Sequence, residues 1–136
     1  MTATKRPSAI SLGLLCGLLI VDPAFATQSI SCSDNKFDSS VNILLGAGPV
    51  PNVLEVTISI VERRLTTVTG QPGEQVSKAQ SYDDGEFLRI DLVDAQATKR
   101  AAVIRLIRRD HKTHPLQVGL VQIEDDVPIG ISCEGP

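Results

Sequence analysis

The sequence predicts an all-β domain, most simply a small antiparallel β-sandwich of about seven or eight strands, Ig-like or similar. Apolar and polar residues alternate with a period of two in several segments, as they do in half-buried strands. Turn signals rich in glycine and proline separate these segments, and no stretch shows the periodicity of an amphipathic helix. A small β-barrel is the alternative, because its strands show the same alternation.

Eight segments are expected as strands: 27–33, 41–46, 53–62, 75–81, 86–94, 101–109, 116–120 and 127–133. The fourth is the weakest, because it is largely polar. Asp84-Gly85 is a favoured tight-turn dipeptide before the fifth. The side chains expected on the apolar faces are Val41, Ile43, Leu45, Leu54, Val56, Ile58, Ile60, Leu88, Ile90, Leu92, Ala102, Ile104, Leu106, Leu116, Val118, Leu120, Val127, Ile129, Ile131 and Cys133.

Residues 1–26 have the order of a secretory signal peptide. Lys5 and Arg6 precede an apolar run over 10–21, and the small-x-small triplet 24–26 follows Pro23. The run is shorter than the roughly 20 residues of a membrane span. An uncleaved anchor is the alternative, and a lipidated Cys16 is disfavoured because that residue lies inside the apolar run. We therefore expect a periplasmic or secreted domain over 27–136, with no membrane insertion after cleavage.

The tripeptide Ile-Ser-Cys occurs at 30–32 and again at 131–133, near the two ends of the expected domain. In an exported chain, the two cysteines Cys32 and Cys133 are expected to form a disulfide. The repeat then marks two strand ends that meet. A redox-active pair is the other interpretation, but the close C-x-x-C spacing is missing.

Charge and composition disfavour several classes of ligand. Without residues 1–26 the chain carries 11 Lys and Arg against 15 Asp and Glu, and this acidic balance disfavours nucleic-acid binding. Within residues 27–136, only Phe37, Tyr82 and Phe87 supply Phe, Tyr or Trp rings, which also counts against sugar and single-strand binding by stacking.

Chemical motifs are weak. His111 and His114 lie on one polar segment and are weak candidates for a metal site, although no free cysteine could complete it. The acidic stretches 83–84 and 124–126 lack the spacing of a calcium loop. No serine lies in a G-x-S-x-G motif. We therefore expect no catalytic residues, no cofactor and no enzyme activity, with a hydrolase that lacks a recognisable motif as an alternative.

The second faces of segments 86–94 and 101–109 combine arginines with apolar residues. If the opposite faces point to the core, one outward patch contains Phe87, Arg89, Val103, Arg105, Ile107 and Arg109. Arginines among apolar side chains are typical of protein interfaces, where guanidinium groups bind carboxylates. A solvated outer face of long charged side chains is the competing interpretation.

The sequence thus favours an exported, non-enzymatic domain that binds another protein with an acidic surface through this patch. An inhibitor, an immunity factor or a chaperone-like assembly factor would each fit. A protein that binds a small ligand or a metal is the second alternative.

Overall fold

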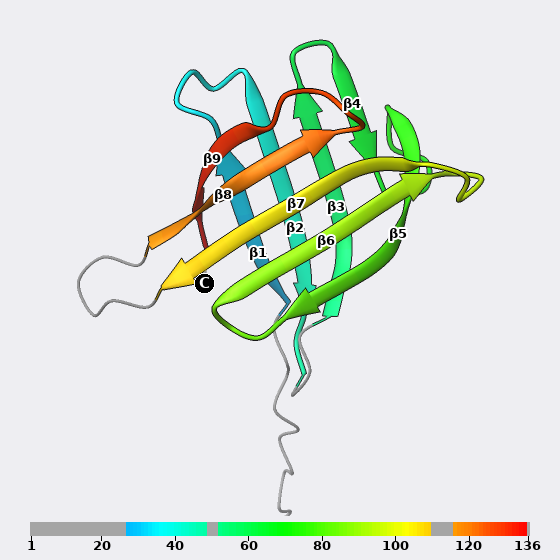
Figure 1. Cartoon of the computed structure of the whole chain (residues 1–136). Helices are drawn as coiled ribbons and strands as arrows, with labels where there is room; N and C mark the ends of the chain where they lie inside the picture. The colour runs from blue at the N-terminus through cyan, green and yellow to red at the C-terminus, as the bar shows by residue number, and fades with distance from the viewer. Residues whose placement is uncertain (1–26, 49–51, 110–115, 136) are drawn as a thin grey trace, which may run out of the picture.

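A computed structural model describes residues 27–48, 52–109 and 116–135, and shows nine β-strands and no helix in these ranges. The strands are β1 (Gln28–Ser33), β2 (Ser39–Gly46), β3 (Asn52–Ile60), β4 (Arg63–Thr66), β5 (Glu74–Asp83), β6 (Phe87–Asp94), β7 (Arg100–Arg109), β8 (Leu116–Ile123) and β9 (Ile129–Glu134). They form one sheet in sequence order, and β9 pairs with β1 to close it into a barrel (Figure 1). The all-β prediction and its barrel alternative are confirmed, whereas the preferred sandwich is not.

The predicted signal peptide lies outside the described residues, as do His111 and His114. The part of the chain that the structure describes contains no helix long and apolar enough to cross a membrane.

Apolar side chains from the strands fill the barrel. Its largest fully buried side chains are Ile30, Ile43, Ile58, Leu65, Leu88, Ile90, Leu92, Ile104, Leu106, Val41, Val56 and Val121. Most of them belong to the alternating faces predicted from the sequence, because a strand places every second side chain on the same side. The interior is therefore a packed core, as in other small barrels.

The disulfide lies at the seam where the barrel closes. Cys32 and Cys133 are bonded and directly opposite each other in the antiparallel β1–β9 ladder. Only two further residue pairs, Ser31 with Glu134 and Ser33 with Ser132, complete that ladder. The Ile-Ser-Cys repeat does mark two strands that meet, as predicted.

The inward and outward faces of β8 are the reverse of those predicted from the sequence. Leu116 is 55% exposed, whereas Gln117, Val121 and Ile123 are buried. The register with β7 decides the phase, because it places Val121 beside Ile104 and thereby puts the even-numbered residues outside. The outer face of β8 is thus more apolar than expected.

Three smaller expectations also failed. Leu54 is 47% exposed, because the β2–β3 register shifts beside it and pairs Val53 with Leu45. Val127 lies before β9 and is exposed. Strand β4 was not predicted, because the turn at Val61 has a positive φ of 49° in a β-branched residue and therefore carries no ordinary turn signal.

Candidate binding surface

The predicted patch lies on the outer face of β6 and β7, and the structure extends it onto β8. Cross-strand pairing places Phe87, Ile107 and Val118 in one row across the three strands. The next row contains Arg89, Arg105 and Leu120. Neighbouring residues in such rows lie about 5 Å apart, so each row is a continuous surface.

The six predicted residues differ in accessibility. Arg89 and Arg109 are exposed, Ile107 is 44% exposed, Phe87 and Arg105 are half-buried, and Val103 is only 7% exposed. Val103 is therefore too buried to offer much contact area, and it lies beneath the exposed residues of the patch. The structure adds Val118 and Leu120, both half-buried on the outer side of β8. Sequence reasoning missed them because it assigned the wrong phase to β8.

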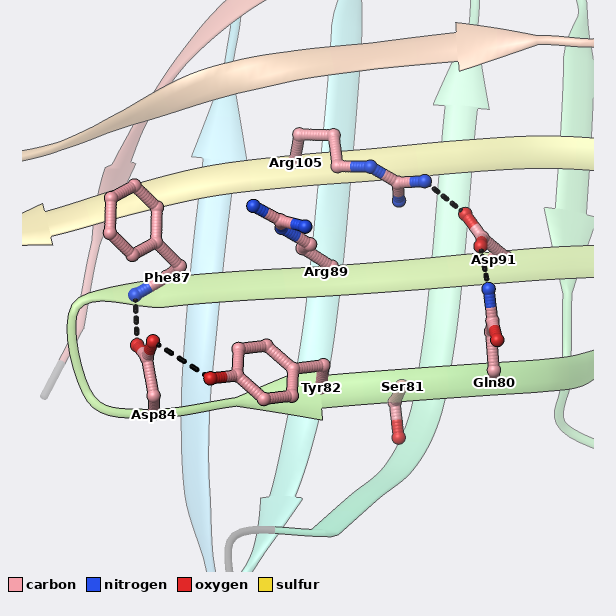
Figure 2. A pocket seen from close by; sticks show the side chains of 8 residues that line it. All are labelled: Gln80, Ser81, Tyr82, Asp84, Phe87, Arg89, Asp91 and Arg105. Carbon is pink, nitrogen blue, oxygen red and sulfur yellow. Dashed lines mark hydrogen bonds and ion pairs between the residues drawn. The ribbon is translucent and has the colours of Figure 1, made fainter.

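The surface is hollowed at two adjoining places. A hollow of about 560 Å³ lies over β5, β6 and β7. Its lining residues are Gln80, Ser81, Tyr82, Asp84, Phe87, Arg89, Asp91 and Arg105 (Figure 2). A second hollow of about 400 Å³ shares Phe87, Arg89 and Arg105 with the first and extends to Leu120. Polar and apolar contact sites are therefore next to each other.

Arg105 is held by groups of its own domain. Its Nη1 donates to the carbonyl oxygens of Ile90 at 3.1 Å and Ile104 at 2.9 Å. Its Nη2 forms an ion pair with Asp91 Oδ1 at 2.5 Å, and Gln80 donates to the other carboxylate oxygen at 2.6 Å (Figure 2). Burial alone raises the pKa of Asp91, but the hydrogen bonds from Gln80 and Arg105 and the charge of Arg105 outweigh it, and the net pKa is lowered.

Asp84 likewise has hydrogen-bond partners within its own domain. It accepts backbone hydrogen bonds from Phe87 at 2.6 Å and Glu86 at 2.9 Å, and the hydroxyl of Tyr82 donates to it at 3.1 Å. The backbone bond from Phe87 is the main cause that lowers the pKa of Asp84. The same hydroxyl–carboxylate bond raises the pKa of Tyr82, which stays a neutral phenol. The loop carboxylate thereby fixes the position of one aromatic ring of the hollow.

Arg89 differs from the other cations of its segment. Every other Lys or Arg from 89 to 109 has a carboxylate oxygen within 4.0 Å. These pairs are Lys99–Glu124, Arg100–Asp125, Arg105–Asp91, Arg108–Asp83 and Arg109–Glu86. The side chain of Arg89 makes no ion pair or hydrogen bond within the described ranges, and Arg89 lies directly opposite Arg105 in the β6–β7 ladder.

Metal ligands do not gather on this surface. Over residues 27–48, 52–109 and 116–135, no group of three or more His, Cys, Asp or Glu side chains could hold a metal ion. The predicted candidates His111 and His114 fall outside these ranges. The surface can chemically offer one guanidinium, a phenol and a row of apolar side chains.

No known protein family, curated protein or solved structure matches the chain. The interpretation of the surface therefore depends on its own geometry.

Proposed function

We propose that this domain is an exported, non-enzymatic module that binds another protein through the outer face of β6, β7 and β8. The observation that carries the proposal is the apolar row of Phe87, Ile107 and Val118 beside the uncompensated Arg89. Apolar side chains that adjoin an unpaired arginine are the composition of an interface core. The Cys32–Cys133 disulfide is consistent with an oxidising compartment.

A solvated outer face is the competing explanation, and it accounts less well for Arg89. Like charges directly opposite each other on neighbouring strands are destabilising. Asp91 supplies a counter-charge to one of the two arginines, Arg105, whereas Arg89 faces solvent without one. A face selected for stability alone would gain from a neutral residue at position 89. An acidic partner supplies the missing counter-charge.

The test is affinity capture from the native cell envelope, with the purified oxidised protein as bait. The informative variants are Ile107→Asp and Arg89→Glu. Their matched controls are Leu54→Asp, an exposed leucine on β3 (47% against 44% for Ile107), and Arg64→Glu, an exposed arginine on β4. The captured protein is then titrated against each variant by calorimetry.

We expect one stoichiometric protein, with affinity reduced at least tenfold by the first two variants and retained by both controls. All four variants should melt within a few degrees of the parent, because the substituted side chains are exposed. Equal binding by all four variants, or capture of no protein, would reject this surface as the binding site.

A further inference from the structure

Given the proposed function, we infer that the hollow over β5, β6 and β7 receives an acidic side chain of the partner, with Arg89 as the group that binds its carboxylate. The inference starts from the charges in the hollow. Asp84, Asp91 and Arg105 all have partners within the domain. Arg89 is the cation of this hollow that none of the described residues neutralises.

The surroundings of Arg89 restrict what can bind there. Tyr82 is its direct cross-strand neighbour on β5, and Phe87 precedes it by one step on the same face of β6. Figure 2 shows the Arg89 side chain on the Phe87 side of the hollow, below Arg105. Aromatic and apolar neighbours exclude water from an ion pair and strengthen it. A planar carboxylate also matches the fork of a guanidinium group.

A phosphate group fits less well than a carboxylate. One free guanidinium is available, while Asp84 and Asp91 line the same hollow with their pKa values lowered. Both carboxylates therefore stay ionised at neutral pH and repel a dianion more strongly than a monoanion. The overall formal charge of −3 adds to that preference.

The second hollow indicates that the acidic residue belongs to a polypeptide. It shares Phe87 and Arg89 with the first hollow and continues over Ile107 and Leu120. A segment with Asp or Glu next to an aliphatic residue can fill both places at once. A free small acid would leave the apolar hollow empty.

The experiment is an NMR titration of the isotope-labelled protein with two short peptides. One is acetyl-Gly-Glu-Leu-amide and the other is acetyl-Gly-Gln-Leu-amide, and inorganic phosphate is titrated separately. The signals followed are the side-chain N–H of Arg89 and the rings of Tyr82 and Phe87. We expect saturable shifts with the Glu peptide and at least tenfold weaker binding of the Gln peptide.

The Arg89→Gln variant should lose the response, Arg89→Lys should weaken it, and Arg64→Gln should leave it unchanged. Equal shifts with both peptides, or phosphate binding tighter than the Glu peptide, would overturn the carboxylate assignment. Because the titration uses pure protein, its result is independent of partner capture. A partner that is lost on Ile107→Asp but retained by Arg89→Gln would reject this inference and leave the proposed function standing.

Discussion

At the scale of single residues, the proposed function depends on which of two neighbouring arginines has a counter-ion. The sequence alone placed Arg89 and Arg105 on one face, because both positions alternate with core residues. It could not assign Asp91 to Arg105, since that contact depends on the register, which pairs Asp91 with Val103 and brings its carboxylate diagonally to Arg105. Arg89 could therefore be identified as the uncompensated cation only from the structure.

The Arg105–Asp91 pair makes a prediction about acid stability. The pKa of Asp91 is lowered in the folded protein, so its ionised form stabilises the fold above the pKa of the unfolded chain. This contribution is lost as the pH falls through the lower, folded-state value. We expect the contribution of Asp91 to the free energy of unfolding to be constant between about pH 5 and 8, and to decrease below about pH 4. Urea unfolding at a series of pH values measures it.

The matched variant for this measurement is Asp91→Asn, which removes the titrating group and keeps the size of the side chain. It should be less stable than the parent at neutral pH, because Arg105 loses its counter-ion. The difference between the two proteins should shrink on acidification. A difference that stays constant down to about pH 2 would show that the pair does not lower the pKa of Asp91.

At the scale of strands, prediction succeeded where charged residues interrupt the apolar residues on one face only. The phases of β6 and β7 were correct for this reason, since Leu88, Ile90 and Leu92 and then Ala102, Ile104 and Leu106 run unbroken on the inner face, whereas arginine or aspartate alternates with apolar residues on the outer face. In β8 both faces carry apolar residues, and Gly119 contributes no side chain to either. Period-two reasoning cannot choose between two such faces, so the pairing with β7 decides.

Gly119 explains how β8 can pack in that phase, and it makes a sharp test. A Cβ at this position would lie 2.0 Å from the carbonyl oxygen of Arg105, whereas a Cβ at Gly130 on β9 would have nothing within 4 Å. The carbonyl belongs to β7 and cannot move without breaking the β7–β8 ladder. We expect Gly119→Ala to cost at least about 2 kcal/mol of stability and Gly130→Ala to change it by less than about 0.5 kcal/mol.

Thermal and urea unfolding of the two alanine variants check this prediction. Both substitutions add the same methyl group to a strand glycine, so backbone entropy and β propensity cancel in the comparison. Similar stabilities would mean that β8 does not approach β7 as closely as described. Gly119→Ala should also weaken partner binding, because Val118 and Leu120 flank the position on the proposed surface.

At the scale of the whole molecule, the strand pattern favoured a sandwich and left the barrel as an alternative. Closure depends on long-range pairing of β1 with β9 and on the short parallel contact of Leu65–Thr66 with Glu74–Gln75. Neither of these two contacts can be predicted from the alternation of apolar and polar residues along a strand. The Ile-Ser-Cys repeat was the one local clue that the first and last strands meet. Closure also removes the free edges that an open sheet of these strands would expose.

The disulfide is expected to supply much of the stability of this closed form. Cys32 and Cys133 are 101 residues apart, and in the chain-entropy description a loop of this length is worth about 4–5 kcal/mol. Replacing both cysteines by alanine should lower the free energy of unfolding by about that amount, as measured by urea unfolding. Hydrogen exchange should increase first in β1 and β9, because only two other residue pairs hold that seam. The reduced parent protein is the control, since it breaks the same bond without changing the side-chain carbons. A loss of less than about 1 kcal/mol in both samples, with unchanged exchange in β1 and β9, would instead assign closure to the backbone ladder and the core.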